Sequence, residues 1–197
     1  MEKINIKYQE KLETISDINE HLPVLRKYGE QCSTIVEMGV RSLVSTWAFL
    51  SSKPRVLISL DIENPKKFGG NIDEVYSLAE EFGINFEFVQ SSSLTYEMPL
   101  SDLLFIDTWH DYLQLKKELH RHHKNVKKYI ILHDTNTFGY IDECEYEHYD
   151  KKREETNLPK GLCPAIDEFL FHNRNWVLWE RRPNNNGLTV LKKITND

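Results

Sequence analysis

The sequence predicts an α/β fold, a doubly wound and mostly parallel seven-stranded sheet with a C-terminal antiparallel hairpin. Apolar runs typical of buried strands alternate with helical segments along most of the chain. This alternation is typical of a parallel sheet covered by helices on both faces. The last two apolar runs are joined by only "PNNN", which is too short for a parallel crossover, so these two strands should pair antiparallel.

Seven segments have the composition of strands: 33–39, 55–62, 85–90, 102–107, 128–134, 175–182 and 187–193. The first five read as near-continuous apolar runs, as expected for strands that are buried on both faces. In the turn between the last two, Gly187 supplies conformational freedom.

Helices are predicted between these strands, over 45–52, 71–83, 111–126 and 163–173, with a leading helix over 12–29. The segment 71–83 shows the clearest ends, because Asn71 or Asp73 can cap its N-terminus and Gly83 can stop it. We expect one domain over residues 1–197, with residues 1–30 as a helical lead-in.

Composition excludes several classes of protein. The net charge of −6 argues against a protein built to bind nucleic acid, which needs a basic surface. Cys32, Cys144 and Cys163 form no CxxC pair, so neither a disulfide framework nor a structural zinc site is indicated. No apolar run approaches the roughly 18 residues that a membrane span needs, and the charged N-terminus lacks a signal core. A cytoplasmic location is the resulting expectation.

Acidic residues stand at or near the ends of four predicted strands: Glu37, Asp61, Asp107 and Asp134. In open α/β sheets the ligand crevice lies beyond the carboxyl ends of the strands. One such acid is readily a helix cap or a structural carboxylate. Four at the same edge indicate a functional site there.

The turn after the first strand, "VEMGVRSLVSTW", favours a small anionic group over a pyrophosphate. Gly39 lets the backbone approach a ligand, and Ser42 and Ser45 offer hydroxyls near a helix N-terminus, a place suited to an amino-acid carboxylate. The turn is neither GxGxxG nor a P-loop. NAD would require further glycines where Leu43 and Val44 stand.

Asp61 ends the second strand, where an acid can accept hydrogen bonds from a ribose diol. A ligand with a ribose and an amino acid but no pyrophosphate corresponds to S-adenosylmethionine. The motifs "VEMGVRSLVST", "LISLDIEN", "DLLFIDTWHDY", "YIILHDT" and "WVLWERRPNNNGLTVLKK" together span most of residues 33–193. With them the chain resembles class I S-adenosylmethionine-dependent methyltransferases, within these the group of macrolide-sugar O-methyltransferases and cephalosporin-hydroxylase-like proteins, and more distantly catechol O-methyltransferase.

The resemblance implies a Rossmann-like methyltransferase sheet and roles for the matched residues. The positions that it assigns to the cofactor are Glu37, Gly39, Ser42, Ser45, Asp61, Gln90, Ser91, Ser92 and Asp107. Asp107 and Asp134 match metal-binding positions of metal-dependent members, where the divalent cation is Mg²⁺ or Mn²⁺. His110 matches the general base of the sugar methyltransferases, so His110 and Asp107 are the expected catalytic residues.

Chemistry supports these roles independently. A sugar hydroxyl is a poor nucleophile, and histidine has a pKa near neutrality, which suits a base that accepts its proton. A divalent cation touching the hydroxyl would lower the pKa of that hydroxyl. His133 stands where metal-dependent relatives tend to have an acid. A histidine ligand would shift the preference toward Mn²⁺, Fe²⁺ or Zn²⁺, or the change means that no metal binds.

The longest stretch without a clear element, residues 135–161, follows the fifth strand on the ligand side. As an acceptor-side loop it offers aromatic and polar groups for a sugar ring: Tyr140, Tyr146, Tyr149, Glu143, Glu145 and His148. The alternative is an acidic surface loop. "HRHH" at 120–123 is interpreted as a solvated helix end, Trp109 as a packing wall, and His21 and His172 as ordinary residues.

The leading functional hypothesis is an O-methyltransferase that acts on a hydroxyl of a sugar or glycan precursor. Two alternatives stay open: a catalytically weakened cofactor-binding or assembly module of the same fold, and a small-phenol, catechol-like O-methyltransferase. The expected partner is a small-molecule or glycan acceptor, without nucleic acid or a membrane span. A homo-oligomer is compatible with the sequence.

Overall fold

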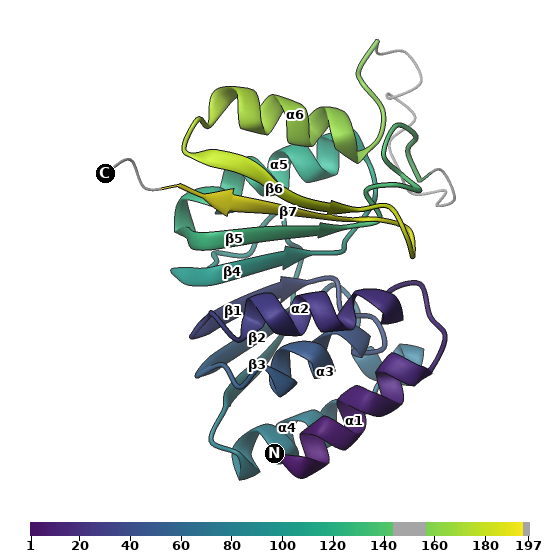
Figure 1. Ribbon diagram of the computed structural model, residues 1–197, viewed down its shortest axis with the longest axis vertical. Helices are drawn as coiled ribbons and strands as arrows, with labels where there is room; N and C mark the ends of the chain where they lie inside the picture. The colour runs from purple at the N-terminus through teal and green to yellow at the C-terminus, as the bar shows by residue number, and fades with distance from the viewer. Residues whose placement is uncertain (144–156, 195–197) are drawn as a thin grey trace.

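A computed structural model describes residues 1–143 and 157–194 and shows one seven-stranded sheet in the order β3-β2-β1-β4-β5-β7-β6 (Figure 1). Its strands are β1 Thr34–Met38, β2 Val56–Asp61, β3 Asn85–Gln90, β4 Ser101–Ile106, β5 Val126–His133, β6 Trp176–Arg182 and β7 Leu188–Lys193. The first five strands pair in parallel, and β7 pairs antiparallel with both β5 and β6. The predicted fold class, with its C-terminal hairpin, is therefore confirmed.

Within residues 1–143 and 157–194, six α-helices flank the sheet: α1 Glu2–Glu13, α2 Leu22–Gly29, α3 Val44–Ser51, α4 Ile72–Glu81, α5 Tyr112–His122 and α6 Leu162–His172. Apolar side chains of α1 to α4 share one buried cluster with one face of the sheet, and those of α5 and α6 share a second cluster with the other face. Neighbouring residues of β1, Ile35 and Val36, belong to different clusters. This alternation shows why the central strands are apolar throughout.

The single leading helix predicted over 12–29 is wrong. The structure has α1 and α2 instead, separated by a short 3₁₀ turn at Asn19–His21. Ser16 Oγ accepts the N–H of Asn19, and Asn19 Oδ1 accepts the N–H of Ser16. Such local side-chain bonds compete with helix continuation, and a proline at the start of α2 lacks the N–H that a helix interior requires.

The prediction that "HRHH" is a solvated helix end is wrong for two of its histidines. His122 and His123 are buried, at 1% and 9% exposure. His122 Nε2 donates to the carbonyl of Ser93 at 2.7 Å, and His123 Nδ1 donates to that of Leu119 at 2.7 Å. Burial lowers the pKa of both rings, which keeps them neutral. They are structural residues.

Three other observations bear on the sequence predictions. Cys32 and Cys163 are free and buried, whereas Cys144, Glu145, Tyr146, His148 and Tyr149 lie outside the described residues. No helix within the described ranges is both long and apolar enough to cross a membrane.

Gly39 joins the end of β1 to the end of β4. Its φ is +83°, a left-handed conformation that favours glycine. A Cβ at this position would lie 1.9 Å from the carbonyl oxygen of Asp107. The backbone after β1 therefore passes directly against the residue that follows β4, and any side chain would force the two strand ends apart.

We expect Gly39→Ala to destabilise the protein by about 2–4 kcal/mol, because strain and overpacking add. Gly69→Ala is the matched control. Gly69 also has a left-handed φ, +77°, but a Cβ there would meet nothing within 4 Å, so it reports strain alone, about 1 kcal/mol. Urea unfolding of both variants measures the difference. Equal losses would show that the close approach to Asp107 carries no cost.

Candidate active site

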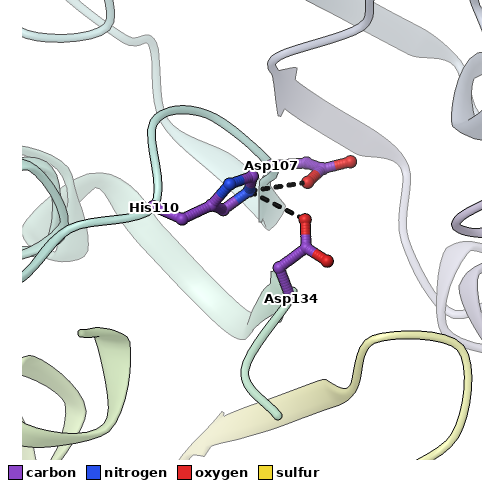
Figure 2. A group of neighbouring side chains, drawn as sticks. All are labelled: Asp107, His110 and Asp134. Atoms are coloured by element: carbon purple, nitrogen blue, oxygen red, sulfur yellow. Dashed lines mark hydrogen bonds and ion pairs between the residues drawn. The ribbon is translucent and has the colours of Figure 1, made fainter. Parts of the chain in front are cut away.

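The carboxyl ends of β4 and β5 bring three chemically active side chains together. Ile106 of β4 pairs with Leu132 of β5, so Asp107 and Asp134, which follow these strands, come to the same edge. The loop after Asp107 returns His110 to this edge. Figure 2 shows the imidazole of His110 pointing at both carboxylates. The predicted cluster at this edge is present.

The ring of His110 is held on three sides. Its Nε2 lies 2.9 Å from Asp134 Oδ2 and 3.5 Å from Asp107 Oδ1. Its Nδ1 lies 2.8 Å from Glu143 Oε2, and the ring of Phe138 stacks on it at 4.9 Å between centroids. Glu143 also donates its backbone N–H to the carbonyl of His110 at 3.0 Å. Both ring nitrogens therefore face carboxylates.

Carboxylates at both nitrogens favour the imidazolium. Burial alone would lower the pKa of His110, but hydrogen bonds to Asp107, Asp134 and Glu143 outweigh it and raise that pKa to about 12. Burial likewise works against ionised Asp107 and Asp134, yet the histidines hold the pKa of each carboxyl below its ordinary value. In this arrangement the charge of the cluster is balanced by protons on imidazole.

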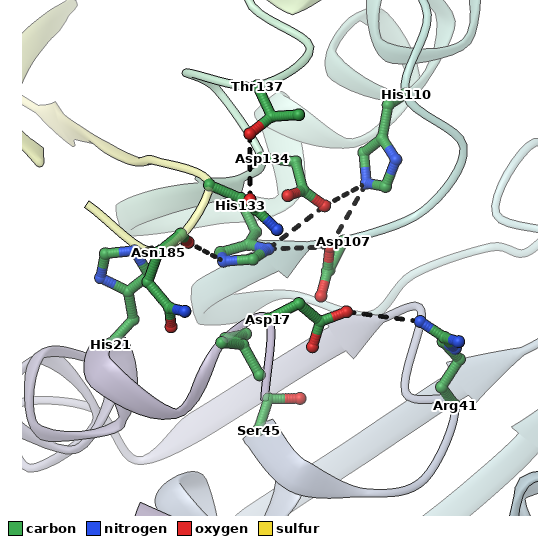
Figure 3. A network of polar contacts seen from close by, with 12 residues as sticks. Asp17, His21, Arg41, Ser45, Asp107, His110, His133, Asp134, Thr137 and Asn185 are labelled. Carbon is green, nitrogen blue, oxygen red and sulfur yellow. Dashed lines mark hydrogen bonds and ion pairs between the residues drawn. The ribbon is translucent and has the colours of Figure 1, made fainter. Parts of the chain in front are cut away.

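His133, the last residue of β5, belongs to the same cluster. Its Nδ1 lies 3.3 Å from Asp107 Oδ1 and 3.4 Å from Asp134 Oδ2 (Figure 3). Burial opposes protonation of this ring, but the charge of Asp107 and the contact with Asp134 raise the pKa of His133 to about 10. On the opposite side, Nε2 donates to the carbonyl of Asn185 at 3.2 Å.

These residues fit a divalent cation. Asp107, His110 and Asp134 each offer one ligand atom, and the three atoms lie within 4.8 Å of one another. Two buried polar atoms of the cluster, His133 Nδ1 and Asp134 Oδ1, make no hydrogen bond of good geometry. A donor set of carboxylate oxygens and imidazole nitrogens suits Mn²⁺, Fe²⁺ or Zn²⁺ better than Mg²⁺, which prefers oxygen.

Glu37 is buried completely beside this edge. Ser59 Oγ donates to its Oε1 at 2.5 Å, and Ser45 Oγ donates to its Oε2 at 3.0 Å. Desolvation raises the pKa of Glu37 to about 7, although the hydroxyls of Ser59, Thr46 and Ser45 counteract part of it. Ser45 thus reaches Glu37, and both predicted cofactor residues lie in one network.

Asp61 caps the loop after β1. Its Oδ2 accepts the backbone N–H groups of Val40 and Arg41 at 2.9 and 3.0 Å, and its Oδ1 accepts that of Glu63 at 2.9 Å. A ribose diol would have to use the lone pairs that remain on these oxygens. The ribose role of Asp61 stays a prediction.

Leu43 is one of the two positions where NAD would require a further glycine. It adopts the left-handed conformation, φ +69°, and its side chain is fully buried. Burial of the leucine offsets the strain of this conformation, so the loop keeps a glycine-like turn without glycine.

The remaining cofactor candidates lie at the same edge. Asp61 of β2 pairs with Gln90 of β3, and the N–H of Ser91 donates to the carbonyl of Asp61 at 2.9 Å. Ser92 follows these residues, and Ser42 lies in the loop between β1 and α3. No contact of the described residues tests what these side chains bind.

Sequence reasoning missed three contributors to the edge. Glu143, for which the sequence predicts a bond to sugar hydroxyls, bonds His110. His21 was interpreted as ordinary, yet its ring packs edge-on against that of His133 at 5.4 Å. Glu118 is a fully buried acid that accepts from Ser93 Oγ and Thr108 Oγ1.

Comparison with known proteins defines the fold of this chain. No protein-family model and no curated protein matches it. Among solved structures, a protein from Corynebacterium glutamicum matches with a TM-score of 0.62 and 16% identity, over 90% of this chain and 82% of its own. The O-methyltransferase TomG from Streptomyces achromogenes, solved with S-adenosylmethionine, matches at 0.59 and 12%, over 92% and 82%.

A third similar structure is the methyltransferase PaMTH1 from Podospora anserina with S-adenosylhomocysteine bound. It matches with a TM-score of 0.55 and 16% identity, over 98% of this chain and 88% of its own. At identities this low, the likeness establishes the fold: the chain has the Rossmann-like fold of S-adenosylmethionine-dependent methyltransferases.

The elevated pKa of Glu37 makes stability depend on pH. The pKa of Glu37 in the folded protein, about 7, exceeds the ordinary value of 4.5, so folding favours the protonated carboxyl. Its contribution to the free energy of unfolding is therefore fully present below pH 4.5 and is lost as the pH rises to 7. At about 1.4 kcal/mol per pH unit the loss is about 3 kcal/mol. Urea unfolding at pH 4.5 and at pH 8 measures the free energy of unfolding of wild type and of Glu37→Gln. The difference between the two proteins should change by this amount between the two pH values. A difference that stays constant between pH 4.5 and 8 would contradict the prediction.

Proposed function

We propose that this protein is an S-adenosylmethionine-dependent O-methyltransferase that acts on a hydroxyl of a sugar or glycan precursor. The observation that supports this most is the convergence of Asp107, His110, His133 and Asp134 beyond β4 and β5. This cluster lies against the loop that begins at Gly39. A proton-accepting site beside a cofactor loop is the arrangement that methyl transfer to a hydroxyl requires.

The cofactor would lie across the loop after β1. In this proposal Gly39, Ser42, Ser45 and Glu37 hold its methionine part, and Asp61 holds the ribose. The adenine would lie near Gln90, Ser91 and Ser92. The structures of TomG with S-adenosylmethionine and of PaMTH1 with S-adenosylhomocysteine show that this fold accommodates such ligands, which supports the cofactor assignment.

His110 is the proposed general base. Glu143 accepts a hydrogen bond from Nδ1–H and thereby leaves Nε2 as the nitrogen that takes the proton of the acceptor hydroxyl. Phe138 fixes the plane of the ring. The acceptor would approach from the side of the loop that carries Glu143, and the sulfonium donor needs alignment more than activation, with the methyl carbon about 3 Å from the oxygen.

Asp107, His133 and Asp134 are the proposed ligands of a divalent cation, with Mn²⁺ favoured over Mg²⁺ by the imidazole. When bound, the cation would supply positive charge that lowers the pKa of the acceptor hydroxyl. His110 would then no longer be required as the counter-charge of Asp134. Its Nε2 would be free to accept a proton.

Transfer of a labelled methyl group from S-adenosylmethionine to a panel of sugars and nucleotide sugars tests the function. We expect transfer in the presence of Mn²⁺, loss with EDTA and recovery when Mn²⁺ is added back. Transfer that ignores both EDTA and Mn²⁺ would reject the cation. Binding of S-adenosylhomocysteine without transfer to any sugar or catechol would instead favour a non-catalytic cofactor-binding module.

His110→Ala should lower the rate of methyl transfer roughly a hundredfold or more, the usual contribution of a general base. Calorimetric affinity for S-adenosylhomocysteine should change little, since the ring faces the acceptor side. His172→Ala is the control, because His172 is exposed at the end of α6. A variant that turns over like wild type would remove His110 from the mechanism.

A further inference from the structure

The turn between β6 and β7 is built in an unusual backbone conformation. Asn185, Asn186 and Gly187 have φ values of +45°, +69° and +99°. Three consecutive left-handed residues are costly for most side chains, and asparagine and glycine tolerate them best. The N–H of Gly187 donates to the carbonyl of Asn184 at 2.8 Å and closes the turn.

The turn points two carbonyl groups at buried histidines. The carbonyl oxygen of Asn185 lies 3.2 Å from His133 Nε2 and 3.1 Å from His21 Nε2. The carbonyl of Asn184 lies 2.9 Å from the same atom of His21. A carbonyl can only accept, so both rings carry a proton on Nε2. Figure 3 shows Asn185 on one side of the His133 ring and the carboxylates on the other.

The turn is fixed from two further directions. Asn186 accepts the N–H groups of Asn136 and Thr137 through its carbonyl, at 2.8 and 3.0 Å. The side chain of Asn185 donates to the carbonyl of Ser16 at 2.9 Å and accepts the N–H of Glu20 at 3.1 Å. The turn is therefore attached both to the loop after β5 and to the segment between α1 and α2.

We propose that the turn Asn184–Gly187 is a positioning element of the candidate active site. The carbonyl of Asn185 accepts the Nε2–H of His133 and so directs Nδ1 of that ring at Asp107 and Asp134. His21 packs edge-on against His133 at 5.4 Å and shares the same carbonyl, which prevents the ring from rotating away. A ligand histidine whose second nitrogen is held by a carbonyl has a fixed orientation and better affinity for a cation.

The role of the turn in cation binding rests on the proposed function. Its role in orienting His133 rests only on the contacts described above. The test therefore uses two readouts in the full-length protein. One is the Nε2–H proton resonance of His133 in cation-free, ¹⁵N-histidine-labelled protein, assigned by its absence in His133→Gln. The other is the affinity for Mn²⁺ by calorimetry.

Asn185→Val and Asn185→Gly form a matched pair. Both remove the side-chain bonds to Ser16 and Glu20, but glycine keeps the left-handed conformation, whereas valine strongly opposes it. We expect Asn185→Val to lose the His133 resonance and to weaken Mn²⁺ binding at least tenfold. Asn185→Gly should keep the resonance and bind Mn²⁺ within about twofold of wild type. In a His133→Gln background, Asn185→Val should have no further effect on Mn²⁺ affinity.

Three results would overturn the inference. The His133 resonance could persist in Asn185→Val, or Asn185→Val and Asn185→Gly could lose the resonance and Mn²⁺ affinity equally. Asn185→Val could also weaken Mn²⁺ binding just as much in the His133→Gln background. If wild type binds no Mn²⁺, the proposed function loses its cation. The His133 resonance in the two variants then decides by itself whether the turn orients this ring. If Asn185→Val does not fold by circular dichroism, Gly187→Ala replaces it, since its Cβ would lie 2.3 Å from Asn136 N. Gly83→Ala, left-handed but free of contacts, is then the control.

Discussion

The buried charges at the end of β4 and β5 constrain the rest of this edge. Asp134 is buried and Asp107 is partly buried, and burial strongly disfavours an isolated carboxylate. His110 and His133 lie between them and balance their charge. Each imidazole then needs an acceptor for its second nitrogen. Glu143 accepts from His110, and the carbonyl of Asn185 accepts from His133. The loop after β5 and the turn between β6 and β7 therefore become part of the site.

The arrangement separates two tasks between sheet and loops. The parallel register of β1, β2, β4 and β5 delivers the ends of four strands to one edge. The loops that follow these strands then hold the polar residues at the strand ends in place. Asp61 fixes the turn after β1 through the backbone of Val40 and Arg41, and Gly39 lets that turn rest against Asp107. Preorganisation of this kind suits a reaction whose barrier depends on alignment.

The fold by itself leaves the acceptor open, because one fold serves many reactions. Two features of the site bear on the acceptor: the imidazoles of the carboxylate cluster, and the loop after β5 that carries Phe138 and Glu143. In the proposed function both features lie on the side where the acceptor approaches, and the acceptor hydroxyl meets a base whose ring plane and Nδ1 partner are already set by the protein.

Sequence alone determined the strands, their parallel pairing, the antiparallel hairpin and the acids at the strand ends, because buried strands and short connections leave local marks in the chain. It also singled out Asp107 and Asp134, since acids that end an apolar run stand out, and the family resemblance added His110. Tertiary structure alone decided which partners hold the histidines. His21, Glu143 and Asn185 carry no periodic signal, and the backbone carbonyl that orients His133 has no side chain to reveal it. The burial of His122 had the same cause, because its ring donates to the carbonyl of Ser93, far away in sequence. The break between α1 and α2, by contrast, follows from local bonds between Ser16 and Asn19.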